Sequence, residues 1–161
     1  MFKDSLIGRC PRARAGGVSL LELLFVAGMM ALLAAIAVPS YRSYVDRLNN
    51  QTAINDIAII SQGIERYYSD NWRLPASLAD IGQDRRLDPW GYPYQYLDFA
   101  FATRGQMRKD RNLVPINSDY DLYSMGRDGR SVPPLTASVS RDDIVRAGNG
   151  GFVGLASDFV P

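Results

Sequence analysis

An apolar run of 21 residues, from Val18 to Val38, contains a single charged side chain, the carboxylate of Glu22. As a helix this run extends about 31 Å, which matches the hydrocarbon core of a bilayer. A glutamate inside the bilayer costs on the order of 2–3 kcal/mol, so an anchor with no other role would tend to avoid one. We therefore expect a membrane helix in which a positive charge is supplied to Glu22.

The 17 residues before this run have the composition of a processed leader. They contain four basic residues and one acid and end in two glycines. Basic flanks stay on the cytoplasmic side, so the chain after the apolar run is expected outside. A cut after Gly17 would free an α-amine at Val18 and leave the helix attached. On a neighbouring copy, that ammonium would attract Glu22 by about 4 kcal/mol at roughly 4 Å and an effective dielectric near 20.

The segment Gly17-Val18-Ser19-Leu20-Leu21-Glu22 resembles the prepilin peptidase site of type IV pilins and type II secretion pseudopilins. The resemblance implies cleavage after Gly17, N-methylation of Val18 and a role for Glu22 in registering subunits during assembly. Pro39 falls where that family keeps a helix-bending proline. Val18 is a departure, since the family usually has Phe or Met there. The alternative interpretation is a plain signal anchor with a chance glutamate.

The length allows one domain beside the anchor: a leader over 1–17, a transmembrane assembly helix over 18–38 and a periplasmic domain over 39–161. Without the leader, 14 basic and 16 acidic residues remain, so no basic surface argues for nucleic-acid binding. The only cysteine, Cys10, lies in the leader. The domain after it therefore cannot be closed by a disulfide.

Helical periodicity continues from Pro39 to about Tyr68, and Pro39 predicts a bend or local unwinding. The apolar positions of this half form one stripe that we expect to pack on the protein's own sheet: Tyr41, Tyr44, Val45, Leu48, Thr52, Ile57, Ile60, Ile64 and Tyr67. Strands are predicted over 93–101, 119–125 and, more weakly, 151–156, with a solvated loop over 104–112. The sequence thus predicts an α+β, pilin-like fold, with a long N-terminal helix packed on a small antiparallel sheet.

Two further motifs are more specific than the processing site. Asp-Pro-Trp-Gly-Tyr-Pro at 88–93 and Asp-Leu-Tyr-Ser-Met-Gly-Arg-Asp-Gly at 121–129 resemble consecutive segments of the major pseudopilin of type II secretion systems. Proline and glycine fix an irregular path in the first motif, and Trp90 is expected to act as a buried anchor. A carbohydrate-binding tryptophan is the alternative.

Asp128, Asp142 and Asp143 flank a proline-rich polar loop, and calcium prefers such carboxylates together with backbone carbonyls. From the residues alone, an alternative is that Asp142 or Asp143 caps a following helical turn. The resemblance implies a calcium site made by Asp128, Asp142, Asp143 and the Met125 carbonyl. The loop over 129–141 is longer than the subfamily leads one to expect.

Catalytic chemistry has few candidate residues. The chain contains no histidine and, once processed, no cysteine, which removes imidazole bases, thiolate nucleophiles and the usual zinc sites. Acid pairs occur at Asp119 with Asp121 and at Asp142 with Asp143, but neighbouring carboxylates are more often solvated or ion ligands. We expect no enzymatic activity.

The resemblance implies a subunit that polymerises into the periplasmic pseudopilus of a type II secretion system and drives protein export across the outer membrane. Its expected partners are other copies of the chain, the prepilin peptidase, an inner-membrane assembly platform and minor pseudopilins. One alternative is an extracellular type IV pilus subunit for adhesion, motility or DNA uptake. Another is a monomeric, membrane-anchored binding module that uses the aromatic segment 90–101.

Overall fold

The computed structural model describes residues 17–111 and 113–160. Its longest element is α1, a 52-residue helix over Leu20–Asn71. The helix ends three residues beyond the expected Tyr68, and it continues through Pro39 without the local unwinding that the proline predicted. The chain forms two compact units, with the boundary between Arg42 and Ser43.

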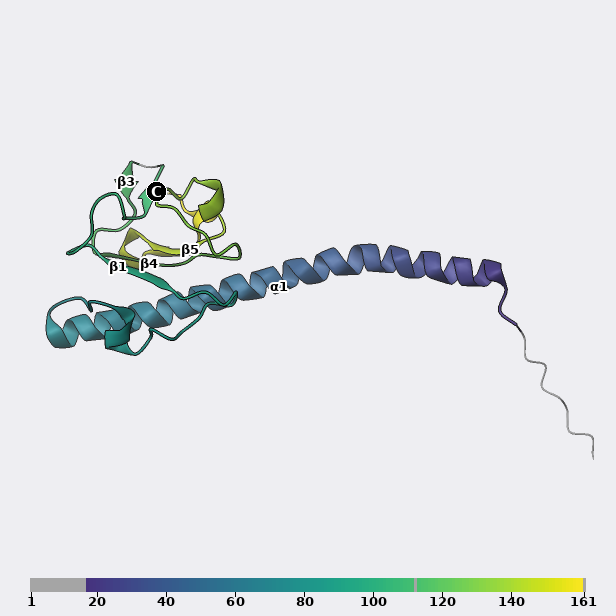
Figure 1. The fold of residues 1–161 in the computed structure, drawn as a ribbon, viewed down its shortest axis with the longest axis horizontal. Coiled ribbons are helices and arrows are strands. Elements are labelled where there is room, and N and C mark those ends of the chain that lie inside the picture. The colour runs from purple at the N-terminus through teal and green to yellow at the C-terminus, as the bar shows by residue number, and fades with distance from the viewer. Residues whose placement is uncertain (1–16, 112, 161) are drawn as a thin grey trace, which may run out of the picture. The chain divides into compact units, whose positions relative to one another are not determined.

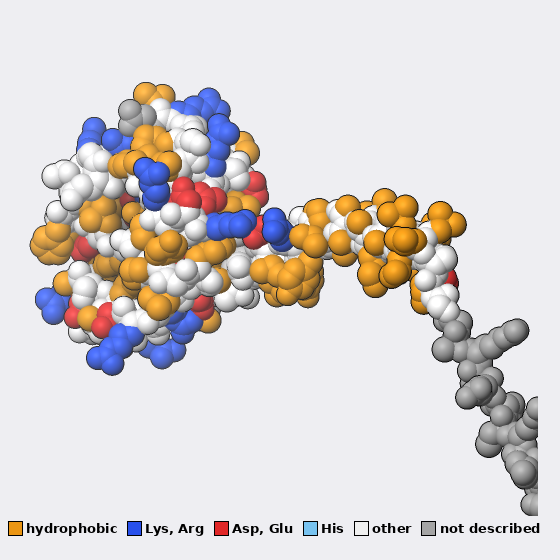
Figure 2. All heavy atoms as spheres, turned by 45° about the vertical axis from the view of Figure 1, so that its right-hand side comes forward, with side chains coloured by type: hydrophobic (Ala, Val, Ile, Leu, Met, Phe, Trp, Pro, Cys, Tyr) orange, Lys and Arg blue, Asp and Glu red, His pale blue; other side chains and the backbone are white. Residues whose placement is uncertain are grey.

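The first unit contains the apolar half of α1. Every described residue from 17 to 42 is exposed, and its apolar side chains form the band of orange spheres along the helix (Figure 2). In the described part of the chain, α1 is the one helix long and apolar enough to cross a membrane. Exposure of so large an apolar surface to water is unfavourable. We therefore expect this half of α1 to be surrounded by lipid or by apolar side chains of other subunits.

The second unit is a small head in which the last turns of α1 lie beside an antiparallel sheet (Figure 1). The sheet has the order β1-β4-β5-β6, and every neighbouring pair is antiparallel. Its strands are β1 (Gln95–Asp98), β4 (Tyr120–Ser124), β5 (Ile144–Ala147) and β6 (Phe152–Leu155). A separate two-stranded ribbon joins β2 (Lys109–Asp110) to β3 (Val114–Pro115). Short 3₁₀ turns are η1 (Leu78–Ile81), η2 (Ser138–Ser140), η3 (Gly148–Gly150) and η4 (Ala156–Asp158).

The sheet contributes side chains to a core cluster on each of its two faces. Successive residues of a strand point to opposite faces, so neighbours in β5 belong to different clusters. Ile144 of β5 belongs to the core cluster under α1, with Ile57, Ile60 and Ile64 of the helix, all fully buried. Its neighbour Val145 belongs to a second cluster on the other face. That second cluster contains Ile116, Leu135, Val145, Ala147 and Ala156.

The stripe predicted on α1 is confirmed only in its C-terminal part. Ile57, Ile60 and Ile64 pack on the sheet as expected. Tyr41, Tyr44 and Leu48 are instead 70%, 62% and 48% exposed, so the expectation that they pack on the protein's own sheet is wrong. Of the predicted stripe, the buried core cluster contains only these three isoleucines.

All three predicted strands are present, in shortened form, as β1, β4 and β6. Strand β5 was not predicted, because Arg146 interrupts its short apolar pattern. Since β5 begins at Ile144, Asp142 and Asp143 do not cap a helical turn, and that alternative is wrong. The prediction of a solvated loop over 104–112 is also wrong in part, since β2 forms there and Arg108 is only 2% exposed.

Candidate functional site

The predicted processing site lies at the start of the described chain. Gly17 and Val18 are both exposed and precede the first helical residue, Leu20. A peptidase needs an accessible peptide bond, and the bond between these two exposed residues lies outside the helix. The rest of the predicted leader, including Cys10, falls outside the described residues, and cleavage and methylation stay predictions.

Glu22 has a local role that the sequence reasoning missed. Its backbone N–H donates to Ser19 Oγ at 3.1 Å, and the Leu23 N–H donates to the Ser19 carbonyl at 3.1 Å. Ser19 therefore caps α1, and the spacing Ser-x-x-Glu is the pattern of a capping box. A carboxylate in the first helical turn also interacts favourably with the helix dipole. Part of the reason for a glutamate here is thus the helix end itself.

The surface around Glu22 is apolar. A shallow groove beside it is lined by Leu21, Leu24, Phe25 and Met29, all of them more than half exposed. At the other end of this stretch, the Ser40 hydroxyl donates to the Ile36 carbonyl at 2.9 Å, next to Pro39. A carboxylate set among uncovered apolar side chains favours pairing with a cation in an apolar assembly.

The motif over 88–93 is organised by one buried carboxylate. Asp88 is 4% exposed, and its Oδ1 accepts the backbone N–H groups of Trp90 at 3.1 Å and Tyr92 at 2.8 Å. Its Oδ2 accepts the Ser124 hydroxyl of β4 at 2.5 Å. Trp90 packs against the main core but is only partly buried, so its prediction as a buried anchor is confirmed in part.

The second motif, over 121–129, depends on two glycines with positive φ. A Cβ on Gly126 would lie 2.3 Å from the Asp142 carbonyl oxygen, and a Cβ on Gly129 would lie 2.3 Å from the Tyr92 ring. Any other residue would also be strained by φ values of +65° and +64°. The two motifs are therefore in contact, and together they hold the start of the 129–141 loop.

The predicted calcium ligands are brought together only in part. Asp142 Oδ2 accepts the Asp128 N–H at 3.2 Å, and Asp128 itself is exposed, two residues beyond Gly126. Met125 is partly buried in the same turn. Asp143 is fully buried and forms an ion pair with Arg108. No group of three or more acidic side chains gathers closely enough in the described residues to hold a metal ion.

This placement does not suit a calcium shell that includes Asp143, because its Oδ2 already accepts Arg108 Nη2 and the Ser131 hydroxyl. Burial raises the pKa of Asp143 to about 6, although the Arg108 charge and hydrogen bonds from Ser131 and Arg108 act to lower it. A carboxyl held in so dry a site depends on its partner cation. Calcium binding stays a prediction.

Curated relatives are similar to this protein over about three quarters of the chain. Type II secretion system core protein G of Pseudomonas aeruginosa is 29% identical over 140 residues, which cover 74% of this chain and 88% of that protein. The same protein of Aeromonas hydrophila is 29% identical over 141 residues, with the same coverage of both chains. The chain is similar to core protein G. The predicted resemblance of the chain to the major pseudopilin of type II secretion systems is thereby confirmed.

A shorter match links the chain to a pilus protein. Fimbrial protein EcpC of Eikenella corrodens is 38% identical over 66 residues, or 41% of this chain and 43% of that protein. No family model matches the chain, and no solved structure matches it either. The similarity to core protein G is thus the broader of the two kinds of match.

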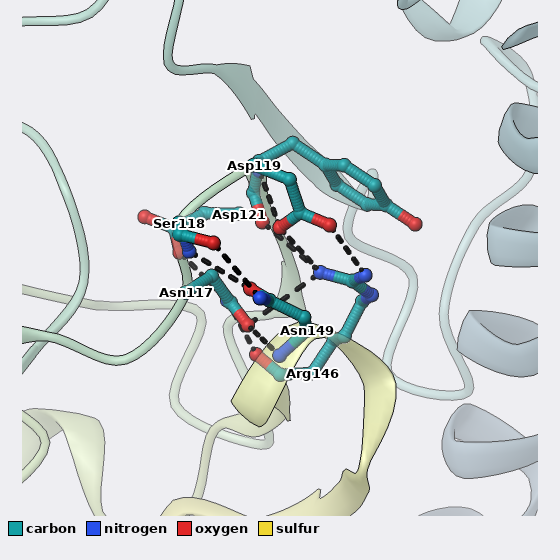
Figure 3. Close-up of polar contacts among 7 residues, drawn as sticks. Asn117, Ser118, Asp119, Asp121, Arg146 and Asn149 are labelled. Carbon is teal, nitrogen blue, oxygen red and sulfur yellow. Dashed lines mark hydrogen bonds and ion pairs between the residues drawn. The ribbon is translucent and has the colours of Figure 1, made fainter.

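Apart from the two motifs, the head contains a polar network that the sequence reasoning missed (Figure 3). Arg146 of β5 is 3% exposed and bonds both oxygens of Asp119, at 2.9 and 2.8 Å. Its guanidinium also lies 4.0 Å from the centre of the Tyr120 ring. Asn117 Nδ2 donates to Asp121 at 3.0 Å and to the Arg146 carbonyl at 2.9 Å.

The acids of this network have structural partners. Burial alone would raise the pKa of Asp119, but hydrogen bonds from Arg146 and from the Tyr120 N–H outweigh it and hold that pKa below its ordinary value. Burial raises the pKa of Asp121, which accepts the Arg108 N–H at 2.6 Å as well as the Asn117 amide. The carboxylates of Asp119 and Asp121 thus accept hydrogen bonds that connect segments of the head.

Proposed function

We propose that this chain is a structural subunit that polymerises through the apolar half of α1 into the pseudopilus of a type II secretion system. The observation that carries the proposal is the uncovered apolar helix, with one carboxylate near its start, attached to a folded head. The similarity to core protein G over about three quarters of the chain supports the same role. A filament core is a natural cover for such a helix, because it replaces lipid by neighbouring copies.

Assembly begins with maturation in this proposal. The prepilin peptidase cuts between Gly17 and Val18 and methylates the new amine. In the growing filament that amine pairs with Glu22 of an adjacent subunit, where the loss of hydration is offset by an attraction of about 4 kcal/mol. The cap at Ser19 fixes the first turn, so Glu22 is held at a constant distance from the cut end.

Before assembly, the subunit is held in the bacterial inner membrane with the apolar half of α1 across the bilayer. The basic leader favours a cytoplasmic amino end, which places the head in the periplasm. An inner-membrane platform then lifts subunits out of the bilayer, and minor pseudopilins are the expected neighbours in the fibre. We propose no catalytic role for the head, because its paired acids serve the strand connections described above.

The proposal is tested by replacing Glu22 in the native host and measuring both filament formation and the secreted fraction of an exported protein. Glu22→Ala removes the charge and half of the capping pattern, whereas Glu22→Gln keeps a residue suited to that position and removes only the charge. Glu65→Ala is the matched control, since Glu65 is exposed on the same helix. Loss of filaments and secretion in both Glu22 variants, but not in the control, is the expected result. Normal filaments in Glu22→Gln would contradict the charge pairing, and normal secretion in Glu22→Ala would contradict the whole proposal.

A second candidate is a subunit of an extracellular type IV pilus, which the match to fimbrial protein EcpC favours. Both candidates need the same helix and the same Glu22, so they are separated by location rather than by mutation. Immunolabelled electron microscopy of cells at native expression distinguishes them. Label on long surface fibres, together with unimpaired secretion in a deletion strain, would replace the pseudopilus by the pilus.

A further inference from the structure

The long 129–141 loop is a packed element of the head. The Lys109 N–H donates to the Pro133 carbonyl at 2.9 Å, and the Lys109 carbonyl accepts the Leu135 N–H at 3.0 Å. The loop therefore pairs with β2 through a bridge between Lys109 and Pro134. Leu135 is 4% exposed and belongs to the second core cluster. The loop thus packs against the segment 108–110.

Arg108 begins this segment, and its side chain contacts residues of the loop. Its Nη1 donates to the Val132 carbonyl at 2.6 Å and to the Ser131 hydroxyl, and its Nη2 donates to Asp143. The guanidinium carbon lies 4.5 Å from the centre of the Tyr123 ring. One buried cation therefore contacts the first residues of the loop, the acid that follows it and strand β4.

We infer that the Arg108 guanidinium closes the 129–141 loop in the place of a bound metal ion. A carboxylate, a backbone carbonyl and a hydroxyl are oxygen ligands of the kind that calcium takes, and here a side chain of the same polypeptide takes them. Arginine suits the task because its five donors form a rigid fork and its charge is permanent. The inference concerns the head alone and holds whichever filament the chain builds.

The unpaired atoms of the site favour the guanidinium over an ion. Arg108 Nε and Asp143 Oδ1 are buried and have no hydrogen-bond partner in the described part of the chain. One is a donor and the other an acceptor, so a two-pronged ion pair between Arg108 and Asp143 would satisfy both. A calcium ion on Oδ1 would leave the Nε donor unpaired and would place two cations side by side in a poorly solvated site.

The two other acids predicted as ligands, Asp128 and Asp142, also have partners that close the turn. Asp128 Oδ1 accepts the Arg130 N–H at 2.8 Å, and Asp142 Oδ2 accepts the Asp128 N–H. These are local carboxylate-to-backbone bonds of the kind that stabilise turns without a metal. All three acids thus stabilise the loop ends through contacts within the chain.

The first test is the thermal melting of the full processed chain in detergent micelles, followed by the summed fluorescence of its two tryptophans, Trp72 and Trp90. We expect the same melting temperature, within about 1 °C, in excess EGTA and in millimolar calcium. A melting temperature that falls by 5 °C or more on chelation would overturn the inference and establish the calcium site instead. This comparison needs no variant, so it decides even where a variant fails to fold.

The second test replaces the cation. Arg108→Met keeps an unbranched chain but removes the charge, and we expect it to lower the melting temperature by about 10 °C in both EGTA and calcium, because Asp143 is left as a buried, unpaired acid. Arg141→Met, at an exposed arginine of the same loop, is the matched control and is expected to melt like the parent. The double variant Arg108→Met with Asp143→Leu removes both charges and is expected to regain most of the loss. An Arg108→Met protein that melts like the control, or a calcium-dependent rescue of it to the parent value, would overturn the inference.

Discussion

Two stretches of α1 are both rich in apolar residues and differ in what covers them. From Leu20 to Val38 every side chain is exposed, whereas Ala53, Ile57, Ile60 and Ile64 are fully buried under the sheet. The first stretch is apolar around its whole circumference, and the second only along one stripe. A helix that is apolar all round needs lipid or other helices as its surroundings, while a striped helix needs one neighbour. One helix thus has two parts that suit different environments: an apolar assembly or bilayer for the first, and the core of the head for the second.

The largest effect is expected where the helix is covered by its own sheet. Ile60→Ala removes a side chain with no exposed surface and should destabilise the head by about 2–5 kcal/mol, because a cavity adds to the lost burial. Thermal melting in detergent measures it. Leu24→Ala, at a position 72% exposed, is expected to leave the melting temperature of the head unchanged. Equal losses in the two variants would contradict the division of α1 into two environments.

A second large effect is expected at the contact between the two head motifs. Gly126→Ala should cost about 2–4 kcal/mol, since the new Cβ meets the Asp142 carbonyl and a positive φ is unfavourable for alanine. Denaturant unfolding of the micelle-bound protein gives this value. Gly105→Ala is the control, because a Cβ there finds only an ordinary contact at 3.9 Å. A Gly126→Ala protein as stable as this control would show that the turn relaxes without cost.

A smaller, pH-dependent effect is expected at the Arg146 network. The pKa of Asp119 lies below its ordinary value of 3.8 in the folded head, so its ionised form contributes stability above that pH. The contribution is lost as the pH falls through 3.8 and then through the folded pKa. Between pH 6 and pH 3, Asp119→Asn should therefore lose less stability than the parent, as melting curves across that range will measure. An unchanged pH profile would contradict the role of the pair, and Asp84→Asn, at an exposed site, controls for net charge.

The smallest effect is expected at the free end of the helix. Ser19→Ala removes the hydroxyl that accepts the Glu22 N–H, which should cost about 1 kcal/mol locally and leave the melting of the head unchanged. Hydrogen exchange of the Leu21 to Leu23 amides in micelles reports this fraying. Ser40→Ala is the control, because its hydroxyl bonds inside the helix to the Ile36 carbonyl. Equal exchange in the two variants would show that Ser19 is no cap.

The sequence predicted those parts of the fold that have local patterns. Periodic apolar residues indicated α1, and aromatic-rich alternation indicated β1 and β4. Arg108 was assigned to a solvated loop because nothing in a charged segment marks one arginine as buried, and its partners Val132 and Asp143 lie 24 and 35 residues further along the chain. Strand β5 was missed for a similar reason, since the buried Arg146 reads as a surface residue until Asp119 is placed beside it.

For the candidate site, motif resemblance predicted which segments matter and left their contacts open. The positions of Asp128 and Asp142 near one turn agree with the predicted grouping, whereas Asp143 pairs with Arg108 instead of joining them. The sequence shows which residues of a loop carry oxygen atoms. It does not show which cation binds those oxygens, because that depends on tertiary contacts between residues far apart in the chain.

The close fit of Gly129 against the Tyr92 ring has an evolutionary consequence. There is no room for even one added carbon on Gly129 while the Tyr92 ring, 37 positions away in the chain, stays in place. A smaller residue at 92 would remove that clash but not the strain that the positive φ of Gly129 puts on any other residue. Relatives that keep this turn should therefore keep glycine at the position of Gly129 even where the aromatic residue has been lost.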